Sequence, residues 1–176
     1  IRRIVMATAG KNLSYLDKKS TPSADPFRFG IVSAEWNAEI TEPLTQGAGE
    51  SLINLGARRY HVDVKKVPGS FELPIAAKLL IESAQYDAVI AIGSVIQGET
   101  RHFEFVCQAV AQGIKDVSLQ TGVPVIFCVL TDDTLEQAKA RSGGKHGNKG
   151  VEAAVAAVKM AYMKSQLSKP FSDEDE

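Results

Sequence analysis

DAVIAIG at residues 87–93 and PVIFCVL at residues 124–130 are continuously apolar runs, and they flank the amphipathic stretch HFEFVCQAVAQGIKDVSLQ at 102–120. Within that stretch, apolar residues recur with helical spacing at Phe103, Val106, Val110, Ile114 and Val117. Continuously apolar runs are typical of strands that are buried on both faces of a parallel sheet. The order strand, helix, strand therefore predicts a parallel sheet with these two strands at its centre.

Two further strands and four further helices complete the expected fold. The strands are FRFGIVS (27–33) and YHVDVKKV (60–67). The helices are expected over 40–57, over 72–83, from Thr134 to about Arg141, and from about Lys149 to Leu167. This alternation predicts an α/β fold: a doubly wound, flavodoxin-like, four-stranded parallel sheet with helices on both faces.

A single domain is expected over residues 27–168. Residues 1–26 combine basic and small polar residues without a hydrophobic period, so we expect a flexible N-terminal arm. Residues 169–176 are expected to be an acidic C-terminal tail. The chain begins with Ile1, and the sequence leaves open whether a transit sequence was removed or upstream residues are simply not included.

Charge and cysteine usage exclude several classes of partner. The 20 basic and 21 acidic residues give a net charge of -1, too balanced for a nucleic-acid or anionic membrane partner. No apolar run approaches the roughly 20 residues of a membrane span. Cys107 and Cys128 fall in a helical and a strand pattern, which predicts buried thiols in a reducing compartment rather than a disulfide or a metal site. We expect small-molecule or protein partners and no metal.

The segments that follow the first three strands carry the residues of chemical interest. They are Ala34–Asn37, Pro68–Glu72 and Ser94–His102. Ligands of open parallel sheets bind beyond the carboxyl ends of the strands, so these segments should converge on one site. None contains a GxGxxG or P-loop motif, which argues against a dinucleotide or nucleoside triphosphate.

Two of the segments could bind an anion. Gly98–His102 passes from a strand into a helix, so its backbone N–H groups and the helix dipole suit a negative charge. Arg141, followed by Lys145 and Lys149, offers cationic side chains on a glycine-rich backbone. The alternatives are an ordinary turn capped by Thr100, and a basic helix end that only complements its own dipole.

A heterocycle would suit the remaining side chains. Glu72 could accept hydrogen bonds from the N–H edge of a ring, while Trp36 and Phe71 stack on its faces. Their alternative roles are a charge at a helix start and a pair of core aromatics. His102 lies in the first turn of a helix, where a neutral imidazole could accept a proton. We expect His61 and His146 to be structural or solvated.

Three motifs together resemble lumazine synthases. VPGSFELP (67–74), GSVIQGETRHFEFV (93–106) and RSGGKHGNKG (141–150) have the order and spacing of that family, and the resemblance extends from about Phe27 to Leu167. It implies a transferase of riboflavin biosynthesis that needs no cofactor. The reaction condenses 5-amino-6-(D-ribitylamino)uracil with 3,4-dihydroxy-2-butanone 4-phosphate to 6,7-dimethyl-8-ribityllumazine, phosphate and water.

The resemblance also implies a role for each site residue. The pyrimidine would contact Trp36, Ser70, Phe71, Glu72, Ser94, Val95, Ile96 and Phe127. In the family, the residue at Phe127 comes from the neighbouring subunit. The phosphate would be bound by Glu99, Thr100, Arg141 and Lys149, and His102 would transfer protons. Trp36 stands where many relatives have phenylalanine, and Gln97 and Glu99 occupy variable positions.

The resemblance implies a homo-oligomer with active sites between subunits. The short interval from Arg141 to Lys149 is similar to that of members that assemble twelve pentamers into a 60-subunit icosahedral shell. The residues ahead of Phe27 resemble plant members, which implies chloroplast localisation, although a cytoplasmic microbial enzyme would have a similar sequence. Three alternatives remain: a flavin- or pterin-binding module, a riboflavin synthase on the same sheet, and a structural shell protein.

Overall fold

The computed structural model of this chain describes residues 20–168, and its centre is one parallel sheet with the strand order β2-β1-β3-β4. The strands are β1 (Phe29–Ala34), β2 (Val62–Val67), β3 (Ala88–Ile96) and β4 (Val125–Asp132). The helices are α1 (Ala38–Asn54), α2 (Leu73–Ser83), α3 (His102–Thr121), α4 (Leu135–Arg141) and α5 (Lys149–Leu167). A small antiparallel pair, β5 (Ser142–Gly144) and β6 (Gly147–Asn148), joins α4 to α5. The expected doubly wound α/β fold is confirmed.

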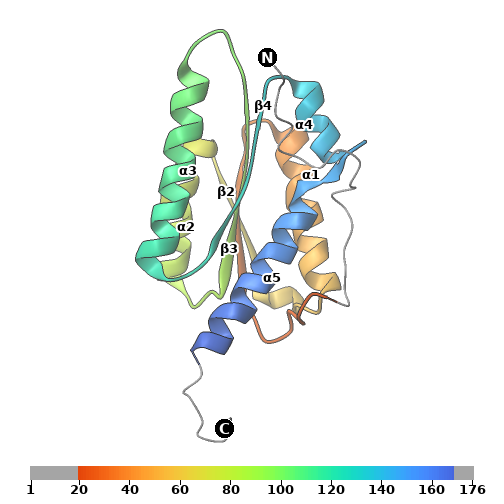
Figure 1. The fold of residues 1–176 in the computed structure, drawn as a ribbon, viewed down its shortest axis with the longest axis vertical. Coiled ribbons are helices and arrows are strands. Elements are labelled where there is room, and N and C mark those ends of the chain that lie inside the picture. The colour runs from red at the N-terminus through yellow and green to blue at the C-terminus, as the bar shows by residue number, and fades with distance from the viewer. Residues whose placement is uncertain (1–19, 169–176) are drawn as a thin grey trace, which may run out of the picture.

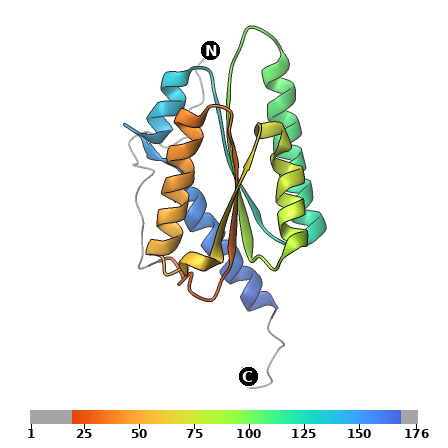
Figure 2. The ribbon, with the colours of Figure 1, turned by 180° about the vertical axis from the view of Figure 1, so that it is seen from behind.

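Helices cover both faces of the sheet (Figures 1 and 2). One buried cluster packs β1, β3 and β4 against α1 and α5, and Cys128 and Leu130 of β4 belong to it. The other cluster packs the opposite face against α2 and α3, and it includes Val125 and Val129. The side chains of β4 thus alternate between the two faces, as a strand requires.

The expected central position of the last strand is wrong. β3 is central, but among the described residues β4 pairs only with β3 and forms one edge of the sheet. The other central strand is β1, whose residues are all buried. An apolar run shows that both faces of a strand are covered, whereas strand order depends on the direction of each crossover, which local pattern does not contain.

Helices α1 and α5 approach each other closely where α5 begins. Gly150 lies against the backbone carbonyl of Leu44, and a Cβ there would overlap that oxygen. Beside it, the Asn148 side chain accepts a hydrogen bond from Gly150 N (2.8 Å) and donates one to the carbonyl of Pro43 (2.9 Å). The same side chain therefore caps α5 and fixes its start against α1.

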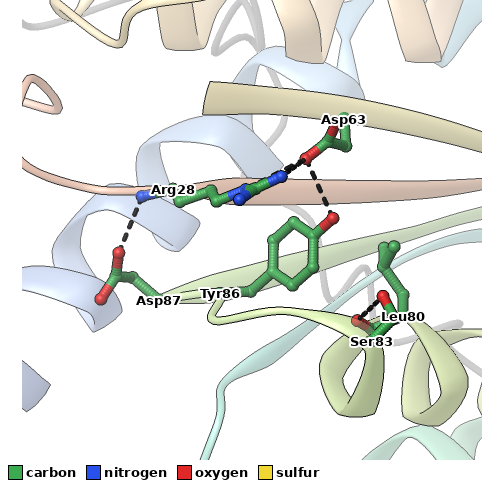
Figure 3. Close-up of polar contacts among 6 residues, drawn as sticks. All are labelled: Arg28, Asp63, Leu80, Ser83, Tyr86 and Asp87. Atoms are coloured by element: carbon green, nitrogen blue, oxygen red, sulfur yellow. Dashed lines mark hydrogen bonds and ion pairs between the residues drawn. The ribbon is translucent and has the colours of Figure 1, made fainter. Parts of the chain in front are cut away.

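A polar network ties the amino ends of the strands together (Figure 3). The Arg28 guanidinium donates to Asp63 Oδ2 (2.8 Å), and the Tyr86 hydroxyl donates to the same oxygen (2.9 Å). The guanidinium carbon also lies 5.0 Å from the centre of the Tyr86 ring. The N–H of Arg28 donates to Asp87 (2.7 Å), so residues beside β1, β2 and β3 share one network at the edge opposite to the expected site.

The expected arm and tail fall largely outside the described residues, which exclude 1–19 and 169–176. Ala24 is described and fully buried, and its N–H donates to the carbonyl of Leu55 (2.9 Å). The packed domain therefore extends beyond Phe27 to at least Ala24. Between residues 20 and 168, no helix has the length and apolar character needed to cross a membrane.

Candidate active site

The segments after β1, β2 and β3 meet at the carboxyl edge of the sheet and, with the start of α3, enclose a cleft of about 440 Å³. This edge contains the point between β1 and β3 where the chain reverses its direction across the sheet. Nine expected site residues line the cleft: Trp36, Ser70, Phe71, Glu72, Ser94, Val95, Ile96, Thr100 and His102. The geometry thus brings together most of the pyrimidine contacts, one phosphate contact and the proposed proton carrier.

Backbone hydrogen bonds to the neighbouring strands place Trp36. Its N–H donates to the carbonyl of Pro68 (3.1 Å), and that of Glu35 donates to Val67 (2.7 Å). The next residue, Asn37, has a left-handed backbone (φ 59°), and its side chain donates to the carbonyl of Ser94 (3.0 Å). Held on both sides, the Trp36 side chain is still 73% exposed at the cleft.

The second segment presents a buried hydroxyl, an exposed ring and a carboxylate in succession. Ser70 is buried against Gly93, where an added Cβ would lie 2.5 Å from Ser70 Oγ. Phe71 is 62% exposed, so it is not a core aromatic. The Glu72 carboxylate lies back over Gly69, where an added Cβ would be 3.2 Å from Oε2. The two glycines therefore leave the space that these polar groups occupy.

Ser94 is the most buried polar residue of the cleft wall. It is 2% exposed, and its Oγ has no hydrogen-bond partner in the described part of the chain. Buried hydroxyls usually have a partner, because an unpaired one loses its bonds to water without compensation. A ligand that hydrogen bonds to Ser94 would supply that partner.

The start of α3 forms the other end of the cleft. Gly98, Thr100 and His102 line it, whereas Glu99 does not. His102 is the first residue of α3 and is exposed, and its N–H lies 3.4 Å from Thr100 Oγ1. The N-cap position belongs to Arg101, which makes no side-chain capping bond, but the Thr100 hydroxyl accepts a hydrogen bond from the first N–H of the helix, as the alternative interpretation expected.

The two expected phosphate cations lie away from this cleft, beside β4. Arg141 ends α4 and pairs with Asp132, the last residue of β4, while Lys149 pairs with Glu152 on α5. Burial raises the pKa of the Cys128 thiol to about 12, and the charges of both cations act on that thiol. Arg141 and Lys149 therefore both lie near Cys128 of β4.

Phe127 is also absent from the cleft. It lies on β4 and lines a second, shallower hollow of about 350 Å³ together with residues of α3 such as Ile114 and Leu119. Its side chain is 43% exposed, and Leu119 and Phe105 of α3 are exposed as well. This apolar surface faces away from the protein core.

Phe103 and Val106 were not expected at the cleft, whereas Asn37, Gly69 and Gly98 belong to the three segments that were expected to converge there. Asn37 had a signal, because asparagine tolerates a left-handed backbone and follows the exposed tryptophan. Phe103 and Val106 were expected in the core stripe of α3, and they line the cleft because that stripe extends past the end of the sheet. In residues 20–168, no three side chains of His, Cys, Asp or Glu are grouped to hold a metal.

Comparison with known proteins gives one consistent result. The family model described as 6,7-dimethyl-8-ribityllumazine synthase matches residues 26–165. The protein of that name from Christiangramia forsetii is 58% identical over 160 residues, covering 90% of this chain and 95% of its own length. The one from Flavobacterium johnsoniae is 56% identical over 169 residues, covering 95% and 89%. These relatives are bacterial, so the expected plant-like character and chloroplast localisation have no support.

Proposed function

The chain belongs to the 6,7-dimethyl-8-ribityllumazine synthase family, and we propose that the cleft beyond β1, β2 and β3 is where its reaction takes place. The chain is thus a transferase of riboflavin biosynthesis. The reaction joins 5-amino-6-(D-ribitylamino)uracil to 3,4-dihydroxy-2-butanone 4-phosphate and yields 6,7-dimethyl-8-ribityllumazine, phosphate and water.

The observation that carries this assignment is the pair of exposed aromatic rings at a cleft with unpaired polar groups. Trp36 and Phe71 line the cleft and are mostly exposed, although apolar rings of this size are usually covered. Glu72 and Ser94 line the same cleft, and the Ser94 hydroxyl has no hydrogen-bond partner among the described residues. Stacked rings beside a carboxylate and a hydroxyl suit a planar pyrimidine with N–H and carbonyl edges.

The butanone phosphate is assigned to the start of α3. This helix has 20 residues, and its first N–H groups and dipole favour an anion there. Gly98 has no other atom within 4 Å of where a Cβ would lie, so the backbone can be approached closely. Glu99 and Thr100 would contact the phosphate through backbone and hydroxyl groups, within reach of His102.

We further propose that a neighbouring subunit completes each cleft with Phe127, Arg141 and Lys149. All three lie on or beside the edge strand β4, whereas the cleft is built from the other three strands. The exposed apolar surface around Phe127 would then be covered in a homo-oligomer. A pentamer, assembled into a 60-subunit shell, is the arrangement that we propose, and sedimentation of the purified protein tests it.

The chemistry requires little covalent participation by the protein. The pyrimidine supplies an amine and the butanone phosphate a carbonyl, which combine to an imine with loss of water. Loss of the proton at C3 of the butanone then expels phosphate, the resulting enol becomes a ketone, and the ribitylamino nitrogen attacks that ketone and closes the new ring with loss of a second water. Holding the two substrates together and moving protons between them are therefore the main contributions of the cleft. His102 is the group placed to carry a proton.

The test follows both products of the reaction in one sample. Purified protein is mixed with both substrates, and lumazine fluorescence is recorded together with released phosphate. We expect one phosphate for each lumazine formed. In separate samples, binding of added flavin by a protein that consumes neither substrate would instead indicate a binding module, and consumption of added lumazine without phosphate release would indicate a riboflavin synthase.

A further inference from the structure

A single buried carboxylate holds Arg141. Asp132 is 5% exposed at the end of β4, and its Oδ1 lies 3.3 Å from Nη1 of Arg141. Its backbone carbonyl accepts a hydrogen bond from Gln97 N (2.9 Å), so the residue is fixed to the end of β3. The Asp132 carboxylate is therefore a fixed acceptor, whereas the guanidinium of Arg141 is carried by a flexible side chain.

Only one of the two carboxylate oxygens of Asp132 has a hydrogen-bond partner among the described residues, which is unusual for an ion pair that serves stability alone. The other oxygen, Oδ2, is buried and has none. Burial raises the pKa of Asp132, while the charge of Arg141 lowers it. A pair that served stability alone would gain by a bidentate contact, because burying a carboxylate is costly unless both oxygens are bonded.

The guanidinium, in contrast, keeps most of its donors available. Arginine has five N–H donors, and within residues 20–168 the structure records one bond from Arg141, to Asp132. Its side chain is 33% exposed, so part of it is accessible to a ligand. Arg141 is therefore a partly exposed cation that is held through one nitrogen and has further donors left for a phosphate.

We propose that Asp132 is a positioning residue, which orients Arg141 to receive the phosphate of the butanone substrate. This inference rests on the proposed phosphate-binding role of Arg141 and adds the residue that sets its geometry. The benefit is preorganisation: less side-chain freedom is lost when the phosphate binds, because Asp132 has already restricted the guanidinium.

The experiment compares Asp132→Ala, Asp132→Asn, Arg141→Ala and the double variant Asp132→Ala/Arg141→Ala in the assembled enzyme. Calorimetric titration measures the Kd of the butanone phosphate, and steady-state kinetics give kcat and the KM of each substrate. We expect Asp132→Ala to raise the Kd of the phosphate substrate roughly fivefold to tenfold, which is about the net contribution of one ordinary hydrogen bond. The KM of the pyrimidine should stay unchanged. Asp132→Asn keeps the size and one acceptor oxygen, so it should retain most of the affinity.

The double variant separates positioning from a general structural effect. Without Arg141 there is nothing for Asp132 to orient, so Asp132→Ala should have no further effect in the Arg141→Ala background. Additive losses, equal changes for both substrates, or tighter phosphate binding by Asp132→Ala would each overturn the inference. If Arg141→Ala weakens phosphate binding and Asp132→Ala does not, the role of Arg141 stands and only that of Asp132 is wrong. If Arg141→Ala leaves phosphate binding intact, both assignments are wrong.

Discussion

Phe127 and Trp36 lie in different hollows of the same subunit. Trp36 follows β1 and lines the cleft at the carboxyl edge, whereas Phe127 lies on the edge strand β4 beside α3. If both contact the pyrimidine, they must belong to different copies of the chain. Mixing variants of the two residues in one assembly therefore tests whether the site is divided between subunits.

Mixed assemblies should recover activity lost in each parent. Trp36→Ala and Phe127→Ala should each lower kcat/KM, by about five- to 150-fold if each ring contributes the ~1–3 kcal/mol of a stacked base. In assemblies formed from both variants, some clefts combine an intact Trp36 with an intact Phe127 from the neighbour. Turnover of the mixture should therefore exceed the average of the two parents.

The control mixes two variants of the same cleft wall, Trp36→Ala and His102→Ala. No cleft in that mixture regains both residues, so its activity should equal the average of its parents. If the Phe127→Ala mixture behaves in the same way as this control, Phe127 does not act on a neighbouring cleft.

His102→Ala should reduce turnover only moderately. The substrates supply their own amine and carbonyl, so the loss should be near or below the low end of the ~10²–10⁴-fold typical of a general acid or base. Single-turnover measurement of lumazine formation, with pyrimidine affinity determined separately, gives this value. A much larger loss with intact binding would mean that His102 does more than transfer protons.

The sequence predicted the elements well because their signals are local. The apolar stripe of α3 predicted a helix over 102–120, and the structure has His102–Thr121. Thr134 predicted the start of α4, and it accepts a hydrogen bond from Gln137 N (3.3 Å). Asn37 shows where prediction of helix ends from the sequence fails. The apolar period predicted that α1 begins near Ile40, but it begins at Ala38. The left-handed backbone of Asn37 turns the chain into the helix earlier than that period indicates.

The site was predictable in part for a geometric reason. Residues after parallel strands share one edge of the sheet, so the sequence alone was enough to expect Trp36, Glu72 and Ser94 together. The position of Arg141 depends on β4 being an edge strand, and strand order is not encoded in local periodicity. Nothing in the sequence marked Asp132 as a site residue, because a carboxylate near the end of a strand is ordinarily a solvated charge.

Gly150→Ala should destabilise the fold. The added methyl group would overlap the Leu44 carbonyl, which belongs to the backbone of α1 and can move only with the helix. We expect a loss of about 1–3 kcal/mol in the free energy of unfolding, the range for overpacked sites. Gly49→Ala in α1 is the matched control: nothing lies within 4 Å of its Cβ position, and alanine should stabilise that helix by about 0.5–1 kcal/mol. Urea unfolding at one fixed protein concentration measures both, and equal effects would contradict the proposed contact.

Asp63 should make the stability of the protein depend on acid pH. Hydrogen bonding from Arg28 lowers the pKa of Asp63 below its ordinary value, and the Tyr86 hydroxyl acts in the same direction (Figure 3). A carboxyl whose pKa is depressed by folding stabilises the protein above its unfolded pKa, and this contribution is lost as the pH falls through the folded value. Asp63→Asn should therefore be less stable than the wild type near neutral pH, and the difference should shrink as the pH falls below about 4, the ordinary pKa of an aspartate.

Tyr86→Phe is the control for that measurement, because it removes one hydrogen bond to Asp63 and keeps the Arg28–Asp63 ion pair. Thermal unfolding of the three proteins across the acid range should show the wild type and Tyr86→Phe converging with Asp63→Asn only at low pH. Since the Arg28 ion pair causes most of the shift, the Tyr86→Phe curve should keep most of the wild-type slope. Parallel curves for Asp63→Asn and the wild type would show that the ionised Asp63 contributes nothing to the folded state beyond its shape.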